Sequence, residues 1–297
     1  MGNAILKRSV AFLSMDDLSD FVCYDDLAIA ELRARGWRAE EVSWRRDGVD
    51  WSAYDAVLIR STWDYHAAPE AFLARLAEID ASPARLENAL PVVRWNLDKR
   101  YLRDLAARGV TTLPTLWPEP LRAGDLTAAF DAFETGEIVV KPVIGAGAVK
   151  THRLTLGAAA ARADVIAADY VAAGLGAIVQ PFAPAIETEG EYSLFYFGDA
   201  YSHTILKTPK SGDFRVQEEW GGVLSAVTPE PALRAAAERL SALCPEPPFT
   251  LRADFVRWSD DWALMELEAI EPSLYFNLDA AAAGRFADAV ERLKKSD

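Results

Sequence analysis

The first hundred residues alternate between short apolar runs and segments with helical spacing. Residues 10–14 and 54–61 have the unbroken apolar character of buried strands, and residues 37–44 alternate as a half-buried strand does. Residues 25–36, which end in glycine, and residues 68–80 have the periodicity of amphipathic helices. This βαβαβ order predicts a parallel sheet covered by helices, which binds ligands beyond the carboxyl ends of its strands.

The pattern then changes to helices separated by paired strands. It predicts helices over 95–110, 125–134 and 231–243 and one near the C-terminus, strands over 111–117, 136–142, 177–182, 249–258 and 263–272, a polar connection over 183–191, a hairpin over 191–207 and a loop over 208–222. We therefore expect an α/β chain of the α+β type with three units. These are a parallel-sheet domain (1–94), a small central unit (95–180) and an antiparallel-sheet unit (181–297).

Composition narrows the functional class. The 297 residues include 45 acidic and 31 basic side chains, for a net charge of −14, which argues against a nucleic-acid partner. Two cysteines are too few for a disulfide framework or a cysteine metal cluster. No apolar run approaches the roughly 20 residues of a membrane helix, and the N-terminus lacks a secretory signal. We expect a cytoplasmic protein with no membrane partner; a homo-oligomer is neither required nor excluded.

Four acidic residues stand out in the last strand pair: Asp254 on one strand, with Glu266, Glu268 and Glu271 along the next. Side chains alternate across a strand, so Glu266 and Glu268 face the same side. If Asp254 faces that side too, three carboxylates converge and need a cation, and oxygen ligands select Mg²⁺ or Mn²⁺. The alternative is a solvated face of the sheet.

The segment GEIVVKPVIGAGAVKT has the character of a phosphate-binding loop without matching either common motif. The Walker pattern fails because Val149 stands where glycine is required, and Lys150 fills the third glycine position of the dinucleotide fingerprint. Lys141 nevertheless closes an apolar strand before a loop that contains Gly145 and Gly147. Backbone amides in such a loop can bind an anion, although a single lysine is more often a surface charge.

Two more basic residues are candidates for the same phosphates: Lys99, in a helix start, and Arg215, in the loop sequence GDFR. At the end of the third strand, the segment RSTWDYH (60–66) is suited to substrate recognition. A structural strand-to-loop junction is the alternative for that segment. A serine-histidine hydrolase is disfavoured because the sequence has no GxSxG motif.

Five motifs occur in an order that resembles the ATP-grasp superfamily of carboxylate-amine ligases. They are NLDKRYL, IVVKPVIGAGA, QPF with EGEYSLFYF, GDFR with GG, and LRADF with LMELEAIEP, and together they cover residues 95–290. The resemblance implies an ATP-grasp fold with an N-terminal parallel-sheet domain, a small lid subdomain and a C-terminal antiparallel subdomain. It also implies ATP and Mg²⁺ (or Mn²⁺) as cofactors, and a flexible glycine loop after Lys141 that closes over the phosphates.

The resemblance implies a role for each matching residue. The implied ATP-binding residues are Lys99, Lys141, Gly145, Gly147, Gln180, Pro181, Phe182, Glu187 and Glu191; the metal ligands are Asp254, Glu266 and Glu268; the catalytic residues are Arg252 and Arg215; and the substrate-binding residues are Arg60, Ser61, Thr62, Asp64, His66, Glu271 and Ser273. Three features depart from the family pattern. Gln180 replaces a glutamate, Glu268 replaces an asparagine, and the long spacing after Gln180 leaves Glu187, Glu189 and Glu191 open as the ribose contact.

Within the superfamily, the segments RSTWDYH and ELEAIEPSLYF resemble the cyclo-ligases that form D-cycloserine from O-ureido-D-serine. The implied reaction activates a small amino-acid carboxylate as an acyl phosphate, which a nitrogen of the same molecule attacks. An intermolecular ligase similar to glutathione synthetase or the glutamate ligases is the first alternative. A non-catalytic nucleotide-binding module is the second, and it is disfavoured because the lysine and carboxylate positions are filled. A sugar-nucleotide or NAD enzyme lacks its glycine fingerprint after the first strand.

Overall fold

The N-terminal sheet is parallel, in agreement with the predicted βαβαβ order. The computed structural model describes residues 8–210 and 212–293. The strands are β1 (Ser9–Ser14), β2 (Arg38–Ser43), β3 (Ala56–Ser61) and β4 (Arg85–Glu87), in the order β2-β1-β3-β4. Strand β4 lies after the helix predicted over residues 68–80, and the apolar pattern of the sequence does not predict it.

Helices cover both faces of this sheet because its strands are apolar on both sides. Val10 and Phe12 of β1 pack towards helices α1 (Asp25–Ala34) and α9 (Ala282–Arg292), and Ala11 and Leu13 pack towards α2 (Pro69–Asp80). The two-residue period of the strand therefore places alternate residues in different cores. One of these cores also contains Phe195 and Phe197 from the large sheet, so the two sheets share their packing.

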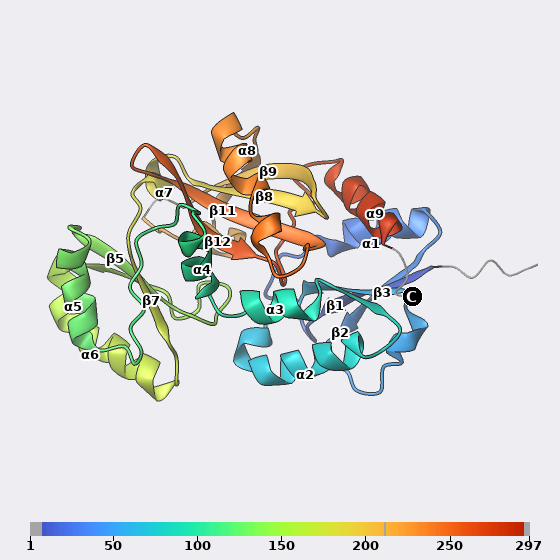
Figure 1. The fold of residues 1–297 in the computed structure, drawn as a ribbon, viewed down its shortest axis with the longest axis horizontal. Coiled ribbons are helices and arrows are strands. Elements are labelled where there is room, and N and C mark those ends of the chain that lie inside the picture. The colour runs from blue at the N-terminus through green and yellow to red at the C-terminus, as the bar shows by residue number, and fades with distance from the viewer. Residues whose placement is uncertain (1–7, 211, 294–297) are drawn as a thin grey trace, which may run out of the picture.

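The central unit is a three-stranded antiparallel sheet with a core of its own. Its strands are β5 (Glu137–Pro142), β6 (His152–Thr155) and β7 (Ala177–Pro181), in the order β6-β5-β7. Helices α5 (Ala123–Ala132) and α6 (Leu156–Ala172) pack on it, and the buried residues of this core all fall within 121–179. The unit lies at the left of Figure 1, apart from the N-terminal sheet.

The large sheet is antiparallel and five-stranded. Its strands are β8 (Glu191–Phe197), β9 (Ala200–Thr208), β10 (Val223–Ala226), β11 (Thr250–Trp258) and β12 (Asp261–Glu268), in the order β10-β9-β8-β11-β12. Figure 1 shows it between the other two sheets. Helices α3 (Leu90–Asn96), α4 (Tyr101–Ala107) and α8 (Pro231–Glu238) pack on one face, and α7 (Ala185–Thr188) connects β7 to β8.

Several predicted boundaries differ from the structure. The single helix predicted over 95–110 is divided into α3 and α4, because the backbone N–H of Lys99 donates to Val143 O (2.8 Å) of the central unit. Residues 111–117 make only isolated bridges from Thr112 and Leu116, and helix α6 was missed. The predicted unit boundaries at residues 94 and 180 stay predictions. Helix α3 runs through the first of these boundaries, and strand β7 runs through the second.

A buried asparagine connects the N-terminal sheet to the large sheet. Asn88, which is 0% exposed and directly follows β4, accepts hydrogen bonds from the backbone N–H groups of Phe249 and Thr250. Its amide donates to Thr250 O and Ala269 O at 2.7 Å each.

No helix among the described residues combines the length and apolar character that crossing a bilayer requires.

Candidate active site

A cavity of about 580 Å³ lies where the three sheets meet. Its wall includes Trp63 and Tyr65 after β3, Lys141 at the end of β5, Gln180 on β7 and the facing strands β11 and β12. Parts of the chain more than 200 residues apart in sequence therefore contribute to one site. The predicted residues that line the cavity are His66, Lys99, Lys141, Gly145, Gly147, Gln180, Pro181, Phe182, Glu191, Arg215, Arg252, Asp254, Glu266, Glu268, Glu271 and Ser273.

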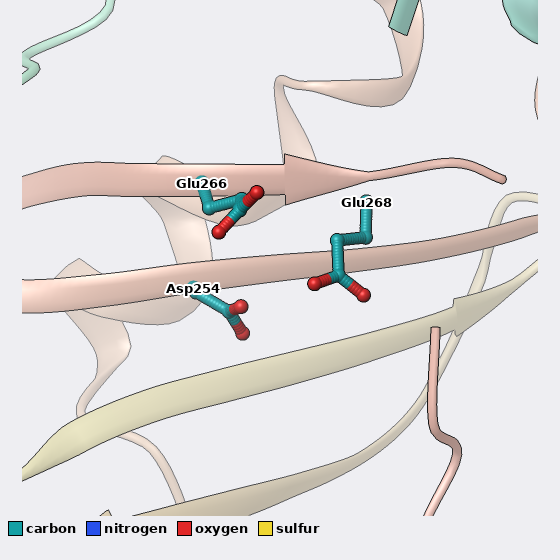
Figure 2. A group of neighbouring side chains, drawn as sticks. All are labelled: Asp254, Glu266 and Glu268. Atoms are coloured by element: carbon teal, nitrogen blue, oxygen red, sulfur yellow. The ribbon is translucent and has the colours of Figure 1, made fainter. Parts of the chain in front are cut away.

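Three carboxylates converge on one wall of this cavity. Asp254 on β11 pairs in register with Glu266 on β12, and Glu268 is two residues further along the same face. One carboxylate oxygen from each lies within 4.8 Å of the others. Figure 2 shows the three side chains projecting from two neighbouring strands on the same side. An all-oxygen set of this size fits Mg²⁺ or Mn²⁺, and the strand alternation had predicted this geometry.

Three cations hold these carboxylates in place. Lys99 Nζ lies 2.6 Å from Glu266 Oε1, and Arg252 Nη2 lies 2.8 Å from Asp254 Oδ2 and 2.5 Å from Glu268 Oε1. Lys207 Nζ lies 2.5 Å from Glu191 Oε1 and 3.6 Å from Asp254 Oδ1. The carboxylates are thus neutralised by protein cations, and a metal ion would compete with them for the same oxygens.

Sequence reasoning missed Lys207, which is only 2% exposed on β9, an interior strand of the large sheet. The sequence does contain a feature that indicates this residue. Lys207 ends the largely buried run SHTILK on β9, and a lysine at that point of an interior strand requires a buried counter-charge. Its register partner on β8 is Glu191, so the pairing of the two strands in the structure brings the two charges together.

Two charged side chains of the cavity differ from the rest. We define the charged inner wall as Lys99, Lys141, Glu191, Lys207, Arg252, Asp254, Glu266, Glu268 and Glu271. Seven of them form ion pairs with one another. Across residues 8–210 and 212–293, Lys141 and Glu271 have no oppositely charged group within 4 Å. The wall therefore has an unpaired amine in one place and an unpaired carboxyl in another.

Burial shifts the pKa values of these groups in different directions. Burial lowers the pKa of the Lys141 amine, and the nearby Lys99 lowers it further. Burial opposes ionisation of Asp254, but Arg252 and Lys207 outweigh it and lower its pKa to about 2. Burial raises the pKa of Glu268 to about 7, and burial together with repulsion from Glu268 raises that of Glu271 to about 8. A ligand that supplied positive charge would favour ionisation of both glutamates.

The loop after β5 is shaped by glycine and by left-handed backbone. A Cβ atom on Gly145 would lie 2.8 Å from Pro142 Cγ, so no larger residue fits without displacement of the ring. Gly147, Ala148 and Lys150 have φ between 55° and 60°. Lys99 Nζ donates to Gly145 O (2.8 Å) and joins the loop to the carboxylate wall. Backbone N–H groups in such successive turns form an anion-binding concavity.

The structure distinguishes between the three acidic residues after β7 that are candidates for the ribose contact. Glu191 lines the cavity, whereas Glu187 does not and instead pairs with Arg153 at 2.6 Å. Glu189 pairs with Arg257 at 2.7 Å, also outside the cavity wall. Gln180 donates from Nε2 to Thr115 Oγ1 at 3.0 Å, which fixes its amide beside the cavity. The geometry therefore favours Glu191 among the three acids that the spacing had left open.

The rim of the cavity is formed by the loop that contains Arg215. Its guanidinium pairs with Asp213 at 2.6 Å and stacks over Trp220 at 3.7 Å. A Cβ atom on Gly222 would lie 2.1 Å from Val216 O, so the loop requires glycine there. Arg215 lines the cavity at this rim but is not in contact with the carboxylates. Its predicted position over the reacting carboxylate stays a prediction.

Four residues of the segment 60–66 that are predicted to bind substrate do not line the cavity. Arg60 is 1% exposed and pairs with Asp25 at 3.0 Å, and Ser61 donates to Ser14 Oγ. Thr62 is buried, and Asp64 accepts hydrogen bonds from Trp44 and Arg45. Strand alternation and the turn that follows direct these side chains into the N-terminal domain.

The other residues of this segment do reach the cavity. Trp63 Nε1 donates to the backbone O of Glu271 at 2.9 Å, and the Tyr65 hydroxyl forms a hydrogen bond with the Glu271 carboxyl. Arg60 contributes indirectly, because its Nη2 donates to Pro272 O at 3.0 Å. His66 also lines the cavity, and burial lowers its pKa. The segment therefore fixes the backbone and side chain of Glu271.

Comparison with known sequences gives two matches of the same kind. Residues 10–88 match the family described as D-cycloserine synthetase DcsG, N-terminal domain. The whole chain is similar to the cycloserine biosynthesis protein DcsG of Streptomyces lavendulae, with 35% identity over 303 residues that cover 95% of this chain and 98% of the relative.

Comparison with solved structures agrees. The crystal structure of D-cycloserine synthetase DcsG has a TM-score of 0.85 and 31% identity, and covers 96% of this chain and 100% of its own. The ATP-grasp ligase PsnB, complexed with a phosphomimetic variant of its minimal precursor, Mg and ADP, has a TM-score of 0.67 and 16% identity, covering 96% and 98%. D-alanine–D-alanine ligase from Bacillus anthracis, complexed with ATP, has a TM-score of 0.65 and 14% identity, covering 96% and 95%. The last two establish the fold alone.

Proposed function

The chain belongs to the family of D-cycloserine synthetase DcsG, and we propose that it converts O-ureido-D-serine into D-cycloserine by ATP-dependent ring closure. It is an ATP-dependent ligase with an ATP-grasp fold. The observation that supports the proposal most directly is the charge arrangement of the cavity. The cavity is lined by Lys141, which has no ion pair among the described residues, and by three carboxylates within 4.8 Å of one another.

We propose that ATP binds between the central unit and the large sheet. Lys141 and Lys99 would pair with phosphate oxygens, and the loop over residues 145–151 would offer backbone N–H groups. Residues 180–182 would hold the adenine through their backbone, and Glu191 would meet the ribose. Binding of the triphosphate would also give Lys141 the counter-charge that it lacks.

Asp254, Glu266 and Glu268 would hold Mg²⁺, whose charge reduces the repulsion between a substrate carboxylate and the phosphates. These residues fit the ion because each offers a carboxylate oxygen, the ligand type that Mg²⁺ prefers, and the three oxygens converge within 4.8 Å of one another. Arg252 contacts two of the three carboxylates, so it would lie beside the substrate carboxyl. We assign it the stabilisation of negative charge on that carboxyl oxygen during acyl transfer.

The proposed chemistry has two transfers. A carboxylate oxygen of the substrate attacks the terminal phosphorus of ATP, ADP leaves and an acyl phosphate forms. The nitrogen bound to the side-chain oxygen of the same molecule then attacks the acyl carbon, and phosphate leaves as the ring closes. Loss of the carbamoyl group by hydrolysis is also required for free D-cycloserine. Water must be excluded before the second transfer, a role we give to the loops over residues 145–151 and 212–222.

The experiment is to supply O-ureido-D-serine, ATP and Mg²⁺ without any other amine, and to follow ADP by a coupled assay and the product by mass spectrometry. We expect stoichiometric ADP and D-cycloserine. ADP formation that required a second amino acid or peptide would contradict the intramolecular reaction and indicate an intermolecular ligase. Absence of ADP with any amino-acid carboxylate would contradict the proposed function as a whole.

A further inference from the structure

We propose that Glu271, oriented by Tyr65, binds the α-ammonium group of an amino-acid substrate and thereby selects amino acids over other carboxylic acids. This inference rests on the proposed function, and it assigns a role to a carboxyl that is not one of the metal ligands. Among the described residues, the group of acids able to share an ion contains Asp254, Glu266 and Glu268 and excludes Glu271.

The burial and isolation of Glu271 indicate a missing positive partner. The residue is 6% exposed, lines the cavity and has no Lys, Arg or His within 4 Å across residues 8–210 and 212–293. A buried carboxylate without a counter-charge carries a large desolvation cost. Its neighbour Tyr65 supplies a neutral hydrogen bond only. A ligand that brings a cation to this point would complete the site.

The surroundings of Glu271 show that its position is tightly controlled. Three side chains from one short segment of the N-terminal domain converge on two consecutive residues. Trp63 Nε1 binds the carbonyl of Glu271 (2.9 Å), Arg60 Nη2 binds that of Pro272 (3.0 Å), and Tyr65 contacts the carboxyl itself. A merely solvated acid would not need this support. Binding of a specific group does need it, because recognition requires a fixed orientation.

The location of Glu271 also matches the geometry of an α-amino acid. An ammonium group and a carboxylate on the same carbon are separated by only two bonds, so their binding residues must be neighbours. Arg252, proposed to lie at the carboxylate, contacts Glu268 at 2.5 Å. Glu271 follows Glu268 by three residues, and the two carboxyls lie close enough to repel each other. The substrate zwitterion would thus lie between Arg252 and Glu271.

The test compares two compounds in wild-type protein and in Glu271→Gln: O-ureido-D-serine and its analogue with hydrogen in place of the α-ammonium group. Binding is measured by calorimetry with Mg²⁺ and a non-hydrolysable ATP analogue, and turnover by phosphate release. For the wild type, we expect the amine-bearing compound to bind about 10- to 100-fold more tightly, as for a charge-assisted hydrogen bond. In Glu271→Gln this preference should fall to within about threefold, with the binding of the analogue unchanged.

Outcomes that contradict the inference differ from those that contradict the proposed function. Equal binding of both compounds by the wild type, or an equal loss for both in Glu271→Gln, would overturn the ammonium site; the second result would instead indicate a general base or a structural role. Absence of turnover with both compounds would overturn the proposed function and leave the binding comparison as the test of Glu271.

Glu78→Gln, on the exposed side of α2, is the matched control and should keep the full preference. If Glu271→Gln does not fold, Tyr65→Phe replaces it, with a reduced preference expected and an unreduced one contradicting the inference.

Discussion

The guanidinium of Arg60 donates a hydrogen bond from Nη2 to the carbonyl of Pro272 (3.0 Å), and so connects the end of β3 to the segment that follows β12. The same guanidinium pairs with Asp25, and both side chains are almost completely buried. Arg60 does not line the cavity. It instead fixes the backbone of the segment after β12, which forms part of the cavity wall. This arrangement changes what its substitution should do.

Arg60→Met should destabilise the protein by about 3–5 kcal/mol, because it leaves the buried Asp25 carboxylate without its partner. Urea unfolding measures the change. The double variant Arg60→Met with Asp25→Leu should recover most of the loss. Arg45→Ala, which breaks the partly exposed pair with Asp64, should cost less than about 1 kcal/mol. An Arg60→Met protein of normal stability would contradict the structural role.

Lys141→Met should weaken ATP binding without weakening the fold. The amine has no carboxylate partner among the described residues, and its burial already disfavours the charged form, so its removal breaks no ion pair. We expect the KM for ATP to rise about 10- to 100-fold, the effect of one charge-assisted contact. The free energy of unfolding should stay constant or increase. Steady-state kinetics at varied ATP is the measurement, with Arg239→Met as a surface control, and an unchanged KM would refute the phosphate contact.

Glu266→Gln combined with Glu268→Gln should abolish Mg²⁺-dependent turnover. The double variant keeps the size of both side chains but removes two of the three charges around the ion site. We expect turnover to fall by more than about 100-fold, and the half-saturating Mg²⁺ concentration to increase in any residual activity. Initial rates over a Mg²⁺ titration test this. Wild-type rates at low Mg²⁺ would remove the metal assignment.

The stability of the ligand-free protein should fall as pH rises from 6 to 9. Glu271 has its ordinary pKa of 4.5 when unfolded and about 8 when folded, so the folded state binds the extra proton in this range. The stability that the neutral carboxyl contributes is complete below pH 4.5 and is lost as pH rises through about 8, by up to about 3 kcal/mol above pH 6.

Glu271→Gln removes this proton and should flatten the decline, whereas Glu78→Gln should leave it unchanged. Urea unfolding at several pH values measures both. Equal slopes in the wild type and Glu271→Gln would mean that Glu271 titrates normally in the folded state. Glu268 is shifted in the same direction, so part of the decline should persist in the variant.

The sequence predicted those parts of the site that depend on short-range geometry. Glu266 and Glu268 face one side because strand side chains alternate, and the neighbouring register brings Asp254 to them. Lys141 and Gly145 lie together because a strand ends and a loop begins there. The parallel sheet followed in the same way from the spacing of its apolar runs.

What the sequence did not provide depends on long-range pairing. Lys207 and Glu191 meet across a hairpin, and only the register of β8 and β9 brings them together. Arg60 and His66 belong to one segment, yet Arg60 is directed into the core and His66 to the cavity, because the chain turns after β3. The helix predicted over 95–110 is broken at Lys99 by a hydrogen bond to Val143, a residue that is distant in sequence and directly follows β5.

The four hydrogen bonds of Asn88 have a consequence for engineering. They link the N-terminal sheet to the start of β11 and to the residue that follows β12, and the two sheets also share one hydrophobic core. We therefore expect these two parts to behave as a single immobile frame, while the central unit, whose core is separate, opens and closes over it. Grafting the N-terminal domain of another ligase onto this chain would disrupt the packing of the shared core, so we expect substrate choice to be altered more readily through individual side chains.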